Sequence, residues 1–550
     1  MFLGLSLAAI QLLPTLEFVR LSVRSNMSFE DFVSYSLPIR QVIQLVFPFY
    51  TPSQFNGIGV LGYVGLLPPV LSIIGFSAYR DRHQTWFWLA ITLFTLLLTL
   101  GNDTPLAQLM YHVPVYNKFR APVRNFVEMS LAISVLAGFG VSALQKQLVS
   151  HRLLLKVILA STGVIVISFV TTLFLGKPIH PLAKNLNNFS SFAWVVVLPT
   201  AFFFIGVAIL LFWSKAVHFK SRGFLLLLMI VVEFVNFNWF CHHRISDDFK
   251  YKNSLTPTTS VENYKKLLTY SNQRILPTRG VLGTYYNKDK YPYKGTLNEI
   301  PPNTSLLWGI PSASGYGPLI LSRYSQLLSI DSFGLVPESL LNGTDRSLDI
   351  TSIRYIFIPQ VTFPSSFLAN ANRWHYVENI NSTSIVYENL RAMPRAWLVP
   401  EVITAKSEEV LQAIKTSKLP DGRLYDPSKI ALVEEQLNFK PQNPDLSATA
   451  KVVDLSNTKL EIQTNSSSPT FLVLSDIYYP GWQAAVDGKP VHIFQTNYVF
   501  RGITVSPGLH RVKVEFKPLS WGLGAGISTA SLFFLGYLGF RFREKTSKCP

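Results

Sequence analysis

Hydrophobic residues are concentrated in the first 240 residues and in one stretch near the C-terminus. About seven apolar stretches occupy residues 1–240, a polar block of about 280 residues follows, and a last apolar stretch covers residues 521–540. A helix needs about 20 apolar residues to cross a bilayer. The pattern therefore predicts a polytopic α-helical membrane protein of about eight spans, with one large water-exposed domain inserted before the last span.

The predicted spans follow the apolar stretches and end where polar residues resume. They cover residues 2–18, 60–79, 86–100, 126–144, 153–175, 193–213, 224–240 and 521–540. In the fourth span, small residues recur at every fourth position on one helix face, namely Ser130, Ser134, Gly138 and Ser142. Small residues let helices approach closely in lipid, so this stripe predicts a packing seam, with a dimer interface as the alternative.

The polar block divides into two regions by its patterns. Residues 241–445 mix short apolar runs with helical periodicity, which predicts an α/β region with helices after Pro257 and over 402–417 and strands at 355–358 and 384–387. Residues 446–518 contain short, often alternating runs separated by Asp-Gly and Pro-Gly turns, which predicts a β-sandwich. The predicted domains are a helical bundle (1–240), these two extracytoplasmic regions (241–445 and 446–518), and a final helix with a basic tail (519–550).

Composition supports a membrane protein and restricts its partners. Only 15% of the residues are charged and 48% are hydrophobic, whereas soluble domains carry about 25% charged residues. Residues 241–520 hold 29 Lys and Arg against 24 Asp and Glu, so most of the net charge of +17 lies in the membrane part. That distribution favours anionic lipid as a partner, not nucleic acid. The two cysteines, Cys241 and Cys549, exclude a disulfide framework.

The cations in the short loops predict the sidedness. The loops after spans two, four and six, together with the C-terminal tail, carry 12 Lys and Arg, and the opposite short loops carry 8. Positive residues favour the cytoplasmic side. We therefore expect a multi-pass protein of the cell membrane, with the large domain extracytoplasmic and the C-terminus cytoplasmic.

Several segments resemble the YfhO family of bacterial membrane proteins. They are AAIQLLPTLEFVRLS with YSLPIRQVIQLVFPFY, YNKFRAPVRNFVEMSLAISVLAGFGV, NTSLLWGIPSASGYGPLILSRY, and LVLSDIYYPGWQAAVDGKPVHIFQTNYVFRGITVSPGLHRVKVEF, in the family's order. The family is similar to the GT-C glycosyltransferases. The resemblance therefore implies transfer of a sugar from a polyprenyl-phosphate carrier to a cell-envelope polymer such as a teichoic acid.

The resemblance also implies that the usual N-terminal spans are lacking. Family members usually carry several more spans before the segment that begins at Met1 here, and the first outer loop of GT-C enzymes normally supplies the catalytic carboxylate. The chain is therefore expected to be the C-terminal part of such an enzyme, a product of a displaced start, or a shortened paralogue.

A lipid-linked sugar phosphate requires cations at the outer membrane surface. Arginine suits phosphate because its planar fork binds two oxygens at once. Arg120 and Arg124 flank Ala121-Pro122 just before the fourth span, and Arg20 and Arg40 follow the first. We predict a phosphate-binding role for these arginines, with Arg124 in the first turn of a helix. The alternative is that they extend to lipid headgroups.

Inverting sugar transfer also requires a carboxylate that accepts the proton of the acceptor hydroxyl. Glu17, Glu30 and Asp31 are the candidates near the predicted outer face. The alternatives are an ion pair between Glu17 and Arg20 and a capping role for the other two acids. Glu30 and Asp31 could also hold a divalent cation; otherwise no cofactor is expected, and His242-His243 lacks the further ligands of a metal site.

Two further carboxylates fall within predicted spans, where they are costly and usually functional. Glu128 lies one turn into the fourth span and could pair with Arg124, and Glu233 lies in the seventh. Glu233 could be a hydrogen-bonding group inside the bundle or line a transport or lipid site. In the outer region, four aromatic residues could contact a glycan or pack in a core, namely Tyr478, Tyr479, Trp482 and Tyr498.

Three functions remain open at this stage. The first is a GT-C-like glycosyltransferase, and the second is a non-catalytic membrane protein whose outer domain binds a glycan or a partner. The third is a lipid or solute transporter, which is less favoured because the sequence contains no internal repeat.

Overall fold

The computed structural model describes residues 2–47, 50–51, 62–175, 177–178, 197–215, 223–235, 257, 259–268, 272–277, 300, 303–315, 317, 319–330, 336–341, 343–359, 372–379, 384–440, 443 and 445–546. The chain forms two compact units. The first unit joins Met1–Ser25 to Lys252–Pro550, and the second covers Asn26–Tyr251.

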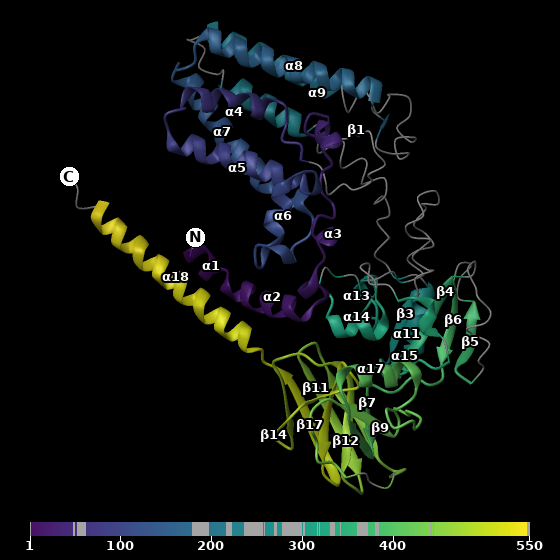
Figure 1. Ribbon diagram of the computed structural model, residues 1–550. Coiled ribbons are helices and arrows are strands. Elements are labelled where there is room, and N and C mark those ends of the chain that lie inside the picture. Colours follow the sequence, from purple (N-terminus) through teal and green to yellow (C-terminus); the bar gives the residue numbers. More distant parts are fainter. Residues whose placement is uncertain are drawn as a thin grey trace. The chain divides into compact units, whose positions relative to one another are not determined.

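The second unit is built of helices (Figure 1). Its longer helices are α4 (Leu67–Ala78), α5 (His83–Thr99), α6 (Pro105–Tyr111), α7 (Phe126–Gln145), α8 (His151–Leu175), α9 (Leu198–Lys215) and Gly223–Val235. Its short elements are α3 (Phe29–Phe32), η2 (Ile39–Leu45), η4 (Gly101–Asp103), η5 (Tyr116–Lys118), η6 (Pro122–Asn125), β1 (Tyr50–Thr51) and β2 (Lys177–Pro178). Apolar side chains of α4, α7, α8 and α9 share one core.

Helices α4 and α7 approach each other closely through glycine. A Cβ atom added at Gly140 would overlap the backbone carbonyl of Leu71, and one added at Gly75 would lie 2.6 Å from the backbone nitrogen of Gly140. The hydroxyl of Ser72 donates to the carbonyl oxygen of Ile133 across the same contact, at 2.8 Å. Among the described residues, nothing lies within 4 Å of a Cβ built at Gly138. The seam with α4 therefore lies on the face beside the predicted small-residue stripe.

Three helices of the first unit are apolar, and they pack together. The helices are α1 (Phe2–Leu7), α2 (Ala9–Leu21) and α18 (Leu519–Thr546), with η1 (Val23–Asn26) after α2, and α18 lies along the first two (Figure 1). A Cβ at Gly524 of α18 would lie 2.5 Å from the carbonyl oxygen of Ala9. The backbone nitrogen of Ile10 donates to the Ser528 hydroxyl at 3.0 Å. Small residues of α18 thus allow close contact with the N-terminal helices.

The remaining part of the first unit contains three sheets with short helices. The four-stranded sheet has the order β3-β4-β6-β5, and β3 and β4 are parallel. Its strands are β3 (Arg274–Pro277), β4 (Ile353–Pro359), β5 (Trp374–Asn379) and β6 (Ser384–Asn389). The helices around the sheets are α11 (Thr259–Leu268), α13 (Thr304–Leu307), α14 (Ser322–Leu328), η10 (Glu338–Leu341), α15 (Ser347–Ile350) and α17 (Ser407–Thr416).

The other two sheets have the orders β7-β12-β16-β15-β9-β8 and β10-β11-β17-β13-β14. Their strands are β7 (Ala396–Val399), β8 (Glu401–Thr404), β9 (Ile430–Val433), β10 (Thr449–Leu455), β11 (Lys459–Ser466), β12 (Thr470–Ile477), β13 (Trp482–Val486), β14 (Lys489–Val491), β15 (Phe494–Thr496), β16 (Phe500–Val505) and β17 (Gly508–Phe516). Residues of both sheets share one apolar cluster, which includes Leu472 of β12 and Val514 of β17.

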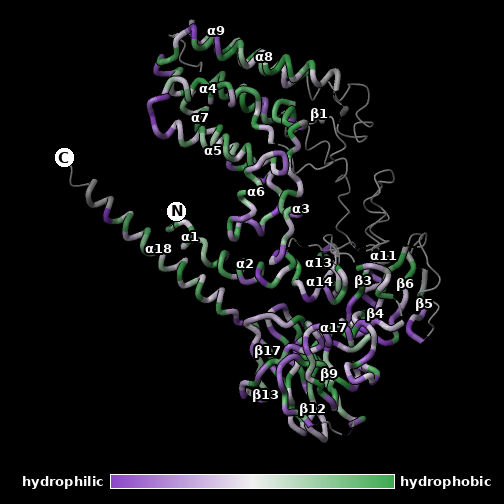
Figure 2. Tube along the Cα trace, viewed as in Figure 1, coloured by the Kyte–Doolittle hydropathy of each residue, from purple (hydrophilic) through white to green (hydrophobic). Residues whose placement is uncertain are grey.

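The length and apolar composition of several helices support a membrane protein. Among the described residues, three helices are long and apolar enough to cross a bilayer, namely Pro122–Gln145, His151–Thr171 and Leu519–Arg541. Shorter apolar helices cover Leu67–Ala78, Leu198–Trp213 and Gly223–Val235. Figure 2 shows the hydrophobic residues along α7, α8 and α18. The predicted span at 2–18 is interrupted at Ala8, where α1 and α2 meet.

Most of the predicted elements of the polar block are confirmed at their positions. One prediction is wrong: residues 402–417 do not form a single helix, because β8 occupies Glu401–Thr404 and α17 begins only at Ser407. Strand β8 pairs with β9 in parallel, which fixes the first residues of that stretch in the sheet. The apolar residues Val402 and Ile403 suit a strand as well as a helix.

Candidate functional site

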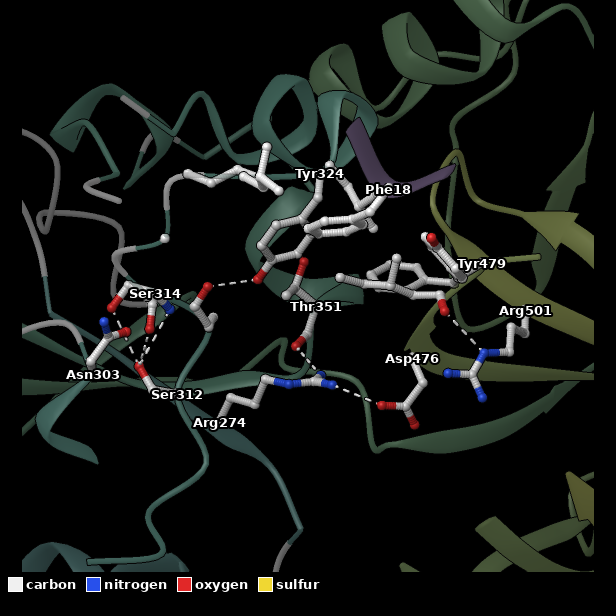
Figure 3. Close-up of a pocket in the computed structure, with 18 of the residues that line it drawn as sticks. Phe18, Arg274, Asn303, Ser312, Ser314, Tyr324, Thr351, Asp476, Tyr479 and Arg501 are labelled. Carbon is white, nitrogen blue, oxygen red and sulfur yellow. Dashed lines mark hydrogen bonds and ion pairs between the residues drawn. The ribbon is translucent and has the colours of Figure 1, made fainter. Parts of the chain in front are cut away.

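A cavity of about 640 Å³ lies within the first unit (Figure 3). Several parts of the chain line it. Phe18 comes from α2, residues 312–315, 317 and 319–321 lead to Tyr324 of α14, and a further wall includes Asp476, Trp482 and Arg501. Arg274, Asn303 and Thr351 complete the lining. Its volume is within the range of small-molecule sites, about 300–1,000 Å³.

The end of α2 forms one wall because two contacts attach it to residues 252–518 of the same unit. The backbone nitrogen of Val23 donates to the carbonyl oxygen of Ile320 at 2.9 Å, so the chain after α2 pairs with the loop that lines the cavity. The rings of Phe18 and Tyr479 lie 5.9 Å apart between centroids. The apolar helix α2 is thereby part of the cavity.

The turn between β12 and β13 attaches the cavity to the start of α18. Gly481 has a φ of +101°, and a Cβ there would lie 2.6 Å from the Cα of Pro518. The backbone nitrogen of Lys517 donates to the Gly481 carbonyl oxygen at 2.7 Å. Since Pro518 immediately precedes α18, the cavity lies beside the ends of two apolar helices.

Arg274 of β3 crosses the floor of the cavity, and its position is set by several hydrogen bonds. Its Nη1 donates to the Thr351 carbonyl oxygen at 2.8 Å and to the Ser475 hydroxyl at 3.1 Å. Its Nη2 donates to the Ser475 carbonyl oxygen at 2.7 Å and to Asp476 Oδ1 at 3.1 Å. Burial, together with the charge of Arg395, lowers the pKa of Arg274 to about 10, so its guanidinium remains charged at neutral pH.

Asp476 lies among three arginines. Its Oδ1 also accepts from Arg395 Nη2 at 2.5 Å, and its Oδ2 is buried without a hydrogen-bond partner among the described residues. Figure 3 shows the guanidinium groups of Arg274 and Arg501 on either side of this carboxylate. Three positive charges therefore accompany one negative charge, which makes this side of the cavity cationic.

Arg501 of β16 is the third arginine. It is 4% exposed, its Nε donates to the Ile477 carbonyl oxygen at 3.0 Å, and its guanidinium carbon lies 3.6 Å from the centre of the Trp482 ring. Burial lowers its pKa to about 10, so it also remains charged at neutral pH. The cation–π contact keeps the guanidinium over the indole.

Aromatic side chains form the opposite wall. The Tyr324 hydroxyl donates to the Ala313 carbonyl oxygen at 2.6 Å, and burial raises the pKa of Tyr324 to about 12. Burial and the adjacent Glu17 carboxylate raise the pKa of Tyr479 well above its usual value. Both hydroxyls therefore stay protonated near neutral pH. An aromatic wall opposite a cationic one suits a ligand with both a ring face and an anionic group.

The first unit contains two of the predicted site residues, Glu17 and Arg20, both on α2. Oε1 of Glu17 is buried without a hydrogen-bond partner among the described residues. Arg20 is exposed in the last turn, and no ion pair joins it to Glu17 in this part of the structure. Glu17 therefore lies next to the cavity, beside Tyr479, whereas Arg20 does not line it.

The other predicted phosphate and base candidates belong to the second unit. Glu30 and Asp31 are in the first turn of α3, where Asp31 accepts from the capping Ser28 hydroxyl at 3.0 Å. Arg120 lies 5.9 Å from the centre of the Tyr35 ring, and Arg124 is exposed in η6 rather than in the α-helix. The backbone of Arg40 is part of η2, and its side chain lies outside the described residues.

The two predicted intramembrane carboxylates have different surroundings. Glu128 is exposed in the first turn of α7, and the described structure contains no ion pair between it and Arg124. Glu233 is 4% exposed and accepts from the Tyr63 hydroxyl at 2.5 Å and from the Leu66 backbone nitrogen at 2.7 Å. Leu66 precedes α4, so Glu233 satisfies a backbone donor at the start of that helix, which supports a structural role.

Of the four aromatic residues singled out between residues 478 and 498, Tyr479 and Trp482 line the cavity. Tyr498 instead contacts Arg323, whose guanidinium carbon lies 4.8 Å from its ring centre. Sequence reasoning did not select Arg274, Asp476 and Arg501. The sequence feature that could have identified them is a charged residue within or next to an apolar strand. Arg501 directly follows Phe500, and Asp476 comes shortly after the apolar run 471–474.

Within the described ranges, no group of three or more His, Cys, Asp and Glu side chains is arranged to hold a metal ion. His242 and His243 lie outside these ranges.

The chain is similar to a known protein family over nearly its whole length. The family model described as bacterial membrane protein YfhO matches residues 1–419 and 430–528. No curated protein and no solved structure matches the chain.

Proposed function

Because the chain belongs to the YfhO family of bacterial membrane proteins, we propose that it is a GT-C-like membrane glycosyltransferase, or the C-terminal part of one. It transfers a sugar from a polyprenyl-phosphate carrier to a cell-envelope polymer. In this proposal the apolar helices form about eight spans, and the five- and six-stranded sheets pack as a β-sandwich. Residues 241–520 face the extracytoplasmic side, as the distribution of cations in the loops favours.

The cavity is the observation that carries this proposal. Its aromatic wall offers ring faces to a sugar, and its arginines offer positive charge to a phosphate. It lies beside the ends of α2 and α18, both of which are apolar helices. A lipid carrier in the bilayer would present its phosphate at such a place.

The proposed chemistry assigns a role to one carboxylate. The acceptor hydroxyl oxygen attacks the anomeric carbon, and the bond from that carbon to the phosphate oxygen breaks. The hydroxyl proton passes to Glu17, and the leaving phosphate keeps the bonding electrons and is stabilised by the arginines. Glu17 suits this role because one of its oxygens is buried without a partner among the described residues, beside Tyr479 of the cavity wall.

Substitution of the two glutamate candidates tests the proposal. Cells that lack the protein are complemented with the wild type, Glu17→Gln or Glu30→Gln at matched protein levels, and the sugar content of the envelope polymers is measured. We expect Glu17→Gln to abolish the sugar addition, by at least about a hundredfold in rate for a general base, and Glu30→Gln to retain it. Envelope sugar that is equal in all strains, including the strain without the protein, would instead favour the non-catalytic alternative.

A further inference from the structure

The two arginines that flank Asp476 differ in how many of their N–H groups are already used. Arg274 makes four hydrogen bonds through its two Nη atoms. Arg501 makes one, from Nε to the Ile477 carbonyl oxygen. Within the described structure neither Nη of Arg501 has a hydrogen bond or an ion pair. Four N–H donors of a charged group are therefore unused at the cavity.

Arg501 is also buried and held in place. It is 4% exposed, and its guanidinium lies against the Trp482 ring at 3.6 Å. Charged side chains are almost never this buried without a partner, because desolvation of a charge is costly. The Nε bond and the indole fix the plane of the guanidinium, so the Nη atoms cannot move out into solvent without breaking both contacts.

The charge of Asp476 favours the charged form of Arg501, but Asp476 makes no direct contact with it among the described residues. Its Oδ1 accepts from Arg274 and Arg395, and no pair with Arg501 lies within ion-pair distance among the described residues. The remaining carboxylate near the cavity, Glu17, lies beside Tyr479. The three arginines exceed Asp476 by two positive charges. An anion bound at Arg501 would therefore meet a positive field together with free donors.

We propose that Arg501 is the residue that binds the phosphate group of a phosphate ester in this cavity, through both Nη atoms. Arginine binds phosphate in this two-pronged way more specifically than lysine does. The aromatic wall receives the organic part of the ester. The assignment of that ester as a substrate rests on the proposed function, whereas the binding site itself does not.

Two sources can supply a phosphate ester here. One is a polyprenyl phosphate in the membrane, and the other is a water-soluble phosphate ester such as a unit of an envelope polymer. Both use the same chemistry at Arg501, and they differ in whether binding requires the lipid.

The test is direct binding to the full chain in nanodiscs of phosphatidylcholine, which carries no net charge. The probes are inorganic phosphate, glycerol 3-phosphate, and undecaprenyl phosphate added to the nanodiscs. Binding is followed by the thermal stabilisation of the protein and by its tryptophan fluorescence, which Arg501 influences through Trp482. The variants are Arg501→Gln, Arg501→Lys and the control Arg423→Gln, which removes an arginine that is 53% exposed on the same unit.

We expect Arg501→Gln to weaken binding of the preferred probe by roughly tenfold to a hundredfold, as for the loss of charge-assisted hydrogen bonds. Arg501→Lys should fall between this variant and the wild type, and Arg423→Gln should bind as the wild type does. Tight binding of undecaprenyl phosphate alone identifies the lipid source, and equal binding of glycerol 3-phosphate identifies the soluble one.

The proposal is overturned if the wild type binds none of the three probes, or if Arg501→Gln binds them as well as the wild type. Should Arg501→Gln fail to fold, wild-type affinity in Arg501→Lys would overturn it equally. Loss of binding in Arg501→Gln with unchanged envelope sugar would leave the binding site in place and reject the transferase proposal alone.

Discussion

Asp476→Asn changes the charge of the cavity while keeping the shape of the side chain. In the wild type, Asp476 Oδ1 accepts from Arg274 at 3.1 Å and from Arg395 at 2.5 Å, and the three side chains are only 10–17% exposed. Removing one partner of a buried pair costs about 3–5 kcal/mol. Here Arg274 keeps its bonds to Thr351 and Ser475, and Arg395 keeps its bond to Asn272.

We therefore expect a loss of about 2–3 kcal/mol in the free energy of unfolding, close to two charge-assisted hydrogen bonds at the lower end of their range. For a unit of this size, a loss of 1 kcal/mol lowers the melting temperature by about 2 °C, so the expected shift is about 4–6 °C. The measurement is thermal unfolding of the purified full chain in detergent.

Two controls distinguish this reasoning from a general effect of substitution. Asp421→Asn removes an exposed partner of Arg423 and should leave the melting temperature unchanged. Asp476→Asn combined with Arg395→Met removes the unpaired cation as well and should recover part of the loss. Phosphate should stabilise Asp476→Asn more than the wild type, since three arginines then lack a carboxylate. A melting temperature equal to that of Asp421→Asn would refute the account of the cluster.

Three further predictions concern packing, pH dependence and sidedness. Gly140→Val should lower the yield of folded protein sharply because its side chain would overlap Leu71 of α4, whereas Gly138→Val on the same helix should resemble the wild type; equal yields of the two variants would contradict the seam. The hydrogen bond that His510 Nδ1 donates to Asp487 Oδ2, at 2.6 Å, raises the pKa of His510. The stability that protonated His510 adds to the fold is therefore complete below the ordinary histidine pKa of about 6.5. It is lost as the pH rises through the raised pKa of His510 in the folded protein. Accordingly, His510→Gln should lower the melting temperature more at pH 6 than at pH 9, and an equal effect at both would exclude this linkage. Ser456→Cys, at an exposed position after β10 in a chain without Cys241 and Cys549, should react with a membrane-impermeant maleimide in intact cells; labelling only after permeabilisation would reverse the sidedness.

The family and the positions of most elements could be predicted from the sequence, because they depend on local pattern. Apolar runs of sufficient length coincide with α7, α8 and α18, and the Asp-Gly turn between alternating runs coincides with the hairpin of β13 and β14. The prediction of a helix failed at residues 402–404, because parallel pairing with β9 places these residues in strand β8. The closest contact of α7 with α4 is at Gly140, beside the predicted stripe, because the position of α4 determines which glycine is buried. The dimer interface stays a prediction.

The cavity could not be predicted in the same way, because its parts are far apart in the sequence. Phe18, Arg274 and Arg501 line one space, although almost 500 residues separate the first from the last. Arginines near the ends of predicted spans are candidates because of the side of the membrane on which they are expected. Burial of an arginine is not visible in the sequence. Arg501 is inside a strand, and its importance follows only from its unused donors and its contact with Trp482.

Helices α2 and α18 and the cavity depend on each other. Phe18 reaches Tyr479 only because α2 ends against the loop at Ile320, and the turn at Gly481 packs on Pro518 at the start of α18. Helices α2 and α18 are in turn joined by Gly524 and Ser528. A soluble fragment without these helices would keep Arg274 and Arg501 but lose the wall that Phe18 provides. Phosphate binding therefore has to be measured on the full chain, since the cavity is built from the sheets together with α2 and the turn that packs on Pro518.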